Sequence, residues 1–171
     1  MTVRISLSDS DLELAQFVAR RCTDMNMRRS DAPAYAMNAE RMQDNYVANY
    51  ASARCELATA KHTNRHWNAS WWKPEQHHLY ADRPDVGDNI EVKRIRDPHH
   101  NLLLKHKYAI LNHILVLAFS DDTTPHLVDL IGWRRGPEAW EEATPPAWDQ
   151  SGKLRLLRQD QLTQFETNEK S

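Results

Sequence analysis

The sequence contains very little glycine. Only four glycines occur among 171 residues, and none of them lies in the first 86 positions: Gly87, Gly132, Gly136 and Gly152. Dinucleotide-binding and P-loop proteins bind phosphate through loops of the forms G-x-G-x-x-G and G-x-x-x-x-G-K-[ST]. Neither loop occurs here, and the G-x-S-x-G motif that carries the nucleophile of α/β-hydrolases is also absent. Any chemistry must therefore come from carboxylate, histidine and lysine side chains.

Cysteines and long apolar segments are also scarce. The two cysteines, Cys22 and Cys55, make neither a disulfide framework nor a zinc cluster. The longest apolar run, Ile114 to Phe119, is too short to cross a bilayer, and residues 1–10 lack the layout of a signal peptide. We therefore expect a cytoplasmic protein in a reducing setting, with no membrane partner.

Neither sign of charge dominates. Lys and Arg number 22, Asp and Glu number 24, and the net charge of −2 by itself argues against nucleic acid as a partner. The distribution is uneven, because residues 87–107 carry a net charge of +2 and residues 108–171 a net charge of −4. The basic groups of the first segment are Lys93, Arg94, Arg96, Lys105 and Lys107. The small average charge therefore conceals a basic strip, and a nucleic-acid partner stays open.

The first third of the chain has the pattern of helices. Apolar residues alternate over positions 3–7 and predict a short strand, after which Ser8 or Ser10 is placed to cap a helix. A second helix is expected over residues 37–62, because this stretch has no Gly or Pro and repeats apolar residues at helical spacing. Glu56 belongs to this second helix.

The remainder has mainly the pattern of strands. Residues 79–86, 89–96 and 102–104 are expected to form a meander, and buried strands are expected at 114–119 and 127–133. Two further helices are expected at 137–142 and 154–165. The fold class that follows is α/β (α+β), with helices flanking a mixed sheet.

One domain is the expectation for a chain of this length. Within it we distinguish an N-terminal strand and helix extension (residues 1–36), a core (37–150) and a C-terminal helix and tail (151–171). A homodimer is a reasonable expectation, because a chain this small has little surface with which to wrap a nucleic-acid duplex.

The segment from Pro84 to Lys93 carries the most specific pattern. If a hairpin turns at Asp88, Asp85 and Glu91 lie opposite one another, and Lys93 shares the face of Glu91 by period-two alternation. Two carboxylates this close repel each other, and a hard divalent cation such as Mg²⁺ or Mn²⁺ relieves the repulsion. A lysine beside such a cation can orient or activate an attacking water. A hairpin with a charged, solvated face needs no function, so that alternative stays open.

At these residues the sequence resembles the PD-(D/E)XK nuclease superfamily. The match consists of Pro84-Asp85, a five-residue spacer and Glu91-Val92-Lys93, with Glu56 as the helical glutamate that many members place before the hairpin. The resemblance implies a restriction-endonuclease-like core. It also implies that Glu56, Asp85, Glu91 and the Val92 carbonyl bind Mg²⁺ or Mn²⁺, and that Lys93 positions the attacking water.

The chain is also similar to small, uncharacterised nuclease-like proteins of bacteriophages. The shared motifs cover roughly residues 40–150 and occur in one order: Glu56-x-Ala-x-Ala-Lys61, Trp67, Asp85-Val-Gly87, Glu91-Val-Lys93 and Gly132-Trp133. The implied activity is metal-dependent hydrolysis of DNA by a phage-encoded enzyme, with Arg94, Arg96, Lys105 and Lys107 contacting the nucleic acid. The alternative is a catalytically inactive module that keeps the fold and binds nucleic acid or protein.

Other motifs admit simpler interpretations. His62 and His66 have the spacing of a helical zinc pair but no evident third ligand, and His99-His100-Asn101 is followed by a predicted strand, which the H-N-H nuclease site does not use. Trp71-Trp72 is either a packing feature or a platform on which bases stack. Arg134-Arg135 is placed to contact phosphate or to form surface ion pairs.

Overall fold

The computed structural model describes residues 2–27, 39–80 and 82–166. Its main sheet is mixed and has the strand order β1-β5-β4-β2, in which β2 pairs in parallel with β4 and the other pairs are antiparallel. The four strands are β1 (Val3–Ser6), β2 (Ile90–Ile95), β4 (Ile114–Ser120) and β5 (Leu127–Arg135). Strand β2 is therefore an edge strand, and the residues of the candidate site lie along it.

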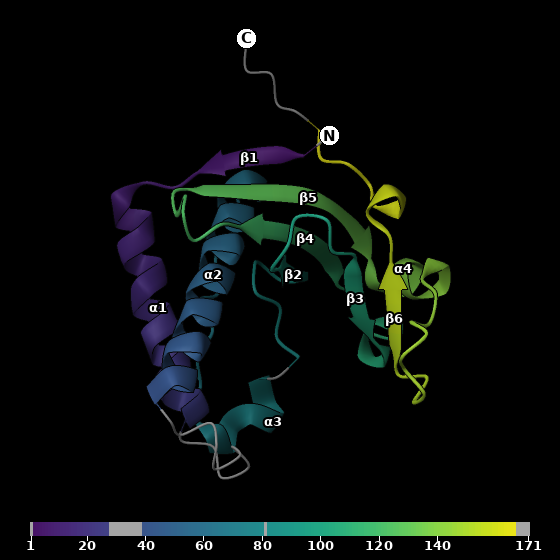
Figure 1. Cartoon of the computed structure of the whole chain (residues 1–171), viewed down its shortest axis with the longest axis horizontal. Coiled ribbons are helices and arrows are strands. Elements are labelled where there is room, and N and C mark those ends of the chain that lie inside the picture. The colour runs from purple at the N-terminus through teal and green to yellow at the C-terminus, as the bar shows by residue number, and fades with distance from the viewer. Residues whose placement is uncertain (1, 28–38, 81, 167–171) are drawn as a thin grey trace.

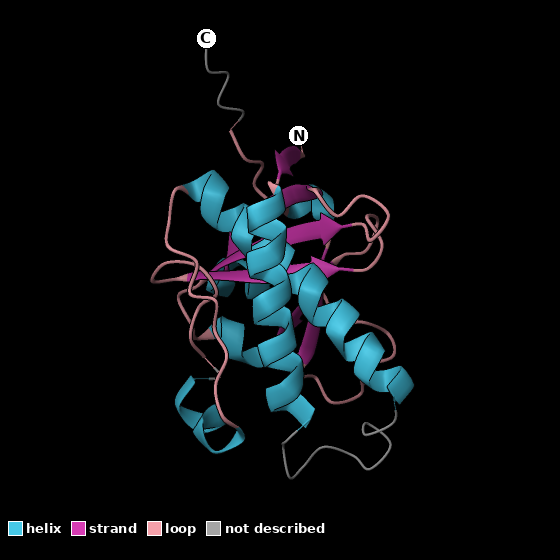
Figure 2. Cartoon of the chain, turned by 90° about the vertical axis from the view of Figure 1, so that its left-hand side faces the viewer, coloured by secondary structure: helices cyan, strands magenta, loops and turns pink. Residues whose placement is uncertain are grey.

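Both faces of the main sheet are covered. Helix α2 (Ala39–Thr63) packs against one face, and helix α1 (Asp9–Met27) packs on α2; Figure 2 shows the two helices on the same side of the sheet. On the other face, a two-stranded sheet of β3 (Leu102–Lys105) and β6 (Leu154–Leu157) lies beside helix α4 (Gly136–Glu142) (Figure 1). Shorter elements complete the chain: η2 (Pro74–Gln76), α3 (His77–Tyr80), η3 (His106–Ala109) and η4 (Gln159–Gln161). The fold is thus a mixed sheet flanked by helices, as the sequence predicts.

Two apolar clusters hold these layers together. Alternate residues of β4 enter different clusters, since Val116 and Ala118 pack beneath the helices whereas Leu115 and Leu117 face the small sheet. A strand buried on both faces has no need of polar alternation. This explains why β4 is a continuous apolar run.

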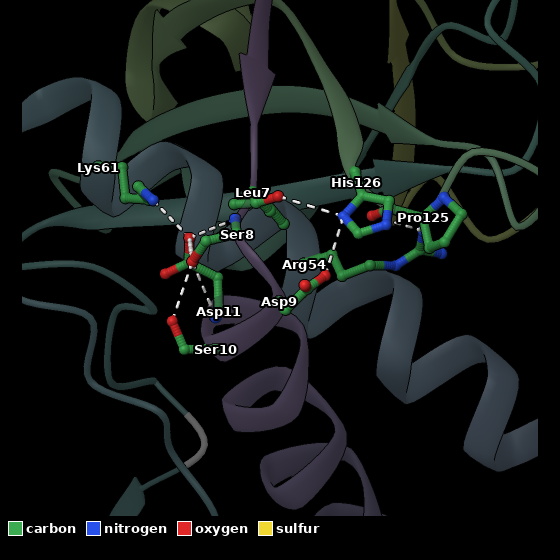
Figure 3. Close-up of polar contacts among 9 residues, drawn as sticks. All are labelled: Leu7, Ser8, Asp9, Ser10, Asp11, Arg54, Lys61, Pro125 and His126. Atoms are coloured by element: carbon green, nitrogen blue, oxygen red, sulfur yellow. Dashed lines mark hydrogen bonds and ion pairs between the residues drawn. The ribbon is translucent and has the colours of Figure 1, made fainter.

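Helix α1 begins as its sequence predicts. Ser8 Oγ accepts the Asp11 backbone N–H, and Asp11 Oδ2 accepts the Ser8 N–H, so the two side chains cap the helix reciprocally (Figure 3). Lys61 of α2 forms an ion pair with the same Asp11 carboxylate. Because β1 pairs with β5 and α1 packs on α2, residues 3–27 are joined to the main sheet and to its helical layer.

Two predicted elements are wrong. The described residues of 79–86, which exclude residue 81, form no strand: helix α3 ends at Tyr80, and among residues 82–86 only Val86 makes bridges. Asp82 and Arg83 are exposed and Pro84 has no N–H, so this segment has neither an apolar face nor a full set of donors for a ladder. Residues 154–165 form β6 and η4 rather than a helix, because β3 turns away from β2 and pairs with β6.

The strands predicted at 89–96, 102–104, 114–119 and 127–133 and the helix at 137–142 are confirmed within a few residues. Gly132 of the Gly-Trp motif serves close packing, because a Cβ at this position would lie 2.8 Å from Leu162 Cβ. No helix in the described part of the chain combines the length and the apolar character needed to cross a bilayer.

Candidate active site

The candidate site is built on a tight hairpin that precedes β2. Val86 pairs with Ile90: the Val86 N–H donates to Ile90 O (3.0 Å), and the Ile90 N–H donates to Val86 O (3.1 Å). The turn is therefore centred on Asp88, which is exposed at its apex, as the sequence predicts. Gly87 has φ +56°, a backbone conformation that glycine adopts without strain.

The segment after α2 fixes this hairpin in place. Asn68 Nδ2 donates to the carbonyl oxygens of Pro84 (2.8 Å) and Gly87 (2.9 Å), and the Asn68 N–H donates to Asp85 O (3.0 Å). Trp67 forms a bridge with Val86. The sequence analysis missed Asn68, for which only its position next to Trp67 gave a signal. Its amide positions the backbone on both sides of Asp85.

Asp85 is held at the outer edge of β2. Its Oδ2 accepts the backbone N–H of Val92 at 2.7 Å. In a strand the N–H and C=O of one residue point to the same side, so the Val92 carbonyl faces the same outer edge as Asp85. The Asp85 carboxylate and the Val92 carbonyl, both predicted as metal ligands, therefore lie on the same edge of the sheet.

Glu91 and Lys93 form an ion pair on the next part of the strand. Lys93 Nζ donates to Glu91 Oε1 at 2.6 Å, and the Tyr108 hydroxyl donates to the same oxygen at 2.7 Å. Tyr108 lies in η3 and is 1% exposed, and Lys93 Nζ is 4.9 Å from the centre of its ring. The sequence analysis also missed Tyr108, because its contact with Glu91 depends on how η3 packs beside β2.

Glu56 approaches from the opposite side of the strand. Ile90 and Val92 pack into the cluster beneath α2, so the alternating Glu91 and Lys93 point to the other face. Glu56 lies on α2, and its Oε2 accepts the Trp67 indole N–H at 2.9 Å. Asp85 at the sheet edge therefore lies between the helix side and the small-sheet side of the site.

Burial and mutual repulsion raise the pKa values of two of these carboxyls. Burial raises the pKa of Glu56 well above its usual range, and the charge of Asp85 raises it further. Burial and then the charge of Glu91 raise the pKa of Asp85 to about 7, which the hydrogen bond from Val92 opposes. Without a neutralising cation, these groups hold protons that ordinary carboxylates release. Such perturbed pairs are typical of functional sites.

The carboxylate oxygens of the site are ligands of the type that hard divalent cations prefer. One oxygen of each carboxylate accepts a protein hydrogen bond, and within the described residues the second oxygen of Glu56, Asp85 and Glu91 accepts none. Among the same residues, however, no three His, Cys, Asp or Glu side chains are arranged to hold one ion. The residues thus provide suitable ligands without a preformed three-carboxylate cage.

The thiol of Cys22 lies near these acids and has a raised pKa. Cys22 lines a cavity of about 180 Å³ together with Glu56 and Asp85. Burial raises the pKa of Cys22 to about 11, and the charges of Glu56 and Asp85 contribute to the rise. The thiol therefore stays protonated near neutral pH, and a protonated thiol is a weak nucleophile and a weak metal ligand.

The protein in EDTA is expected to lose stability as the pH rises through the titration range of Asp85. The folded carboxyl, with a pKa of about 7, holds a proton that the unfolded chain releases at its ordinary value of 3.8. Between these two pKa values the free energy of unfolding falls by up to about 1.4 kcal/mol per pH unit because of this carboxyl. Outside them the contribution of this carboxyl does not change with pH. Urea unfolding of the wild type and of Asp85→Asn at about pH 5 and about pH 8 measures this slope.

The asparagine variant still accepts the Val92 N–H but does not titrate, so its stability relative to the wild type should increase with pH. Asp88→Asn, at the exposed apex of the same hairpin, is the matched control and should follow the wild type. The interpretation is contradicted if the difference in unfolding free energy between the wild type and Asp85→Asn is the same at both pH values.

The predicted nucleic-acid contacts fall into two groups. Lys105 and Lys107 line a groove of about 440 Å³ together with Glu91, Lys93 and Tyr108. Arg94 lines this groove as well. Arg94 and Arg96 together line another hollow, which lies at the far end of β2 beside residues 119–122. Lys107 also forms an ion pair with Asp82. The structure thus brings the lysines next to Lys93 and places Arg96 away from it.

His62, His99 and Arg134, which belong to other motifs of the sequence, make structural contacts. The His62 ring packs edge-on against Phe165, and the turn at Asp97 includes His99, whose N–H donates to Asp97 Oδ1. Arg134 forms ion pairs with Glu138 and Glu142, which favours a surface ion-pair role for that residue. Neither histidine motif therefore gains support as a metal site.

Comparisons of this chain with protein-family models, with curated proteins and with solved structures found no match.

Proposed function

We propose that this protein is a metal-dependent nuclease that hydrolyses phosphodiester bonds in DNA. The observation that carries the proposal is the arrangement along edge strand β2. There the Glu91–Lys93 ion pair follows a hairpin whose Asp85 carboxylate is hydrogen-bonded to Val92. A restriction-endonuclease-like core belongs to the same proposal, as does the bacteriophage origin that the sequence motifs suggest. The cytoplasm is the expected site of action, and a homodimer would extend the surface available to a duplex.

Each group of the site has a role in this proposal. Asp85, Glu91, Glu56 and the Val92 carbonyl would hold Mg²⁺ or Mn²⁺, which supplies Lewis-acid stabilisation of the charge that develops on the phosphate. Lys93 orients the attacking water and donates to the reacting oxygens. Its Nζ is already fixed by Glu91 and lies over the Tyr108 ring.

The basic groove beside Lys93 is suited to the nucleic-acid backbone. Lys105 and Lys107 line it, and their ammonium groups are suited to neutralising phosphates next to the scissile bond. Binding through such contacts weakens steeply with salt, because counterions are released from the nucleic acid.

A second candidate is a module that keeps this fold and binds nucleic acid or protein without cleaving it. The observation in its favour is that the described residues hold no preformed three-ligand metal site. Such a module should bind divalent cations weakly, and replacement of Lys93 should leave its binding unchanged.

Calorimetric titration with Mn²⁺, combined with a cleavage screen, separates the two candidates. We expect Mn²⁺ binding and cleavage of at least one of linear, circular, single-stranded and branched DNA. Asp85→Asn should abolish both, whereas the control Asp88→Asn should retain both, because Asp88 lies at the solvent-exposed turn. Absence of Mn²⁺ binding together with intact substrates of every shape would favour the binding module.

A further inference from the structure

A hollow lined by aromatic side chains, distinct from the one beside Arg96, adjoins the candidate site. We call it the aromatic hollow. It has a volume of about 340 Å³, and the side chains that line it include Trp71, Trp72, Gln76, Tyr80 and Arg83. Trp71 is 44% exposed, so part of its ring is accessible to a ligand in the hollow. The hydrolytic chemistry proposed above makes no use of these side chains.

The aromatic hollow adjoins the cavity that is lined by the acids. Ser70, Trp72 and Arg83 line both the hollow and the cavity that contains Glu56 and Asp85. The loop that carries the two tryptophans begins at Asn68, whose N–H donates to the Asp85 carbonyl. The hollow is therefore fixed relative to Asp85 by direct hydrogen bonding.

The aromatic rings are held in place by neighbouring groups. The Arg21 guanidinium lies 5.4 Å from the Phe17 ring centre and 5.5 Å from that of Trp71. The Arg83 guanidinium lies 4.2 Å from the Tyr80 ring centre, and the Trp72 and Tyr80 rings are 6.1 Å apart. Rings held in this way lose little conformational entropy when a flat ligand stacks on them.

The chemistry of the hollow suits a nucleobase. Indole and phenol rings stack on the flat face of any base, a guanidinium binds phosphate, and an amide hydrogen-bonds to a base edge. Arg83 makes no ion pair within the described part of the chain, and in the same residues Gln76 uses only its Oε1, which accepts the Lys73 N–H. Donors suited to a phosphate and to a base edge are therefore available beside the rings.

We propose that the aromatic hollow binds an unpaired nucleobase next to the scissile phosphate, so that the protein acts on single-stranded or frayed DNA. A base inside a duplex has both faces covered by its neighbours and cannot stack on a protein ring without leaving the helix. The proposal rests on the proposed function for its nucleic-acid substrate, but the hollow itself binds without any cleavage step.

Fluorescence anisotropy in EDTA tests the hollow independently of cleavage. The probes are a labelled single strand of roughly 16 nucleotides and the blunt duplex of the same sequence. We expect the single strand to bind at least about 10-fold more tightly than the duplex. Trp72→Ala should weaken single-strand binding by about 5- to 150-fold, the range given by loss of one stacked base, and duplex binding less than about 2-fold.

Two further variants keep the test decisive. Trp148→Ala, in which the replaced ring is 64% exposed and lies outside the hollow, is the matched control and should bind like the wild type. If Trp72→Ala does not fold, as judged by circular dichroism, Trp71→Ala replaces it, because the partly exposed Trp71 ring is easier to remove. Equal affinity for single strand and duplex, or wild-type binding by a folded hollow variant, would overturn the proposal.

The outcomes also separate this inference from the proposed function. Preferential single-strand binding without metal-dependent cleavage supports the hollow and contradicts the nuclease. Cleavage with no preference for unpaired bases supports the nuclease and overturns the hollow.

Discussion

Replacing Lys93 by methionine is expected to lower the rate of metal-dependent DNA cleavage by at least about 10²-fold, the usual contribution of a positioned proton-transfer group. Lys93 Nζ is the cation next to Glu91, at 2.6 Å, and its side chain is 28% exposed, so it reaches both the buried carboxylate and the groove. Methionine keeps the length of the apolar stem but removes the charge. The measurement is the single-turnover cleavage rate with saturating Mn²⁺.

The structural role of the ion pair must be separated from catalysis. Lys93→Arg retains a cation next to Glu91 and should unfold near the wild-type urea midpoint, yet its planar guanidinium cannot occupy the position of the ammonium group. We therefore expect Lys93→Arg to be stable and poorly active. Lys153→Met, at an exposed position outside the site, is the control for loss of a lysine charge. Cleavage by Lys93→Met within about fivefold of the wild-type rate would refute the role given to Lys93.

Replacing Arg54 by alanine is expected to destabilise the protein by about 3–5 kcal/mol, because it removes a large buried side chain and the donor of two backbone carbonyls. The Arg54 side chain is fully buried on α2, and its guanidinium donates to Asp121 O (2.9 Å) and Pro125 O (3.3 Å). It also pairs with Asp122 Oδ1 at 2.6 Å and lies 4.7 Å from the Tyr50 ring centre. Figure 3 shows this side chain reaching from the helix toward Pro125.

The loss has two physical causes. Truncation leaves the carbonyl oxygens of the turn between β4 and β5 without their donor, and it opens a cavity between α2 and that turn. A domain is typically stable by only about 5–15 kcal/mol, so the shift in urea midpoint should be large. Asp122→Ala opens no internal cavity, because the Asp122 side chain is 58% exposed, but it leaves the buried guanidinium without its carboxylate and should also destabilise the protein.

A matched control is Arg4→Ala, because Arg4 pairs with Asp129 on the surface and its side chain is 65% exposed. Its urea midpoint should stay close to that of the wild type, and Arg54→Met, which keeps most of the buried volume, should fall between the two. If Arg54→Ala unfolds at the same urea concentration as Arg4→Ala, Arg54 does not hold the turn to α2.

The sequence predicted the elements whose patterns are local. Alternation marked β1 and β2, the absence of Gly and Pro marked α2, and the turn chemistry around Asp88 placed the hairpin. These features depend on neighbouring residues, whose backbone preferences and side-chain periods act within a few positions. For the same reason the nearness of Glu91 and Lys93 was predictable, since two residues along a strand share one face.

Elements that depend on distant partners were not predictable in this way. The segment 154–165 became β6 because the backbone of β3 needed a partner strand, and β2 paired in parallel with β4 rather than in a meander. A short apolar run is compatible with helix or strand, and only the available partner decides between them. Local pattern alone therefore gave the wrong element for residues 154–165.

The candidate site divides along the same line. The sequence by itself determined which carboxylates and which lysine lie around the hairpin. Only the tertiary structure placed Glu56 on the other side of β2, joined Tyr108 to Glu91 and set Asn68 under the Asp85 backbone. The raised pKa values of Glu56 and Asp85 arise from burial and from charges that distant segments bring together. Such effects have no signature in local sequence, because the packed chain alone sets the distances and the solvent exposure on which they depend.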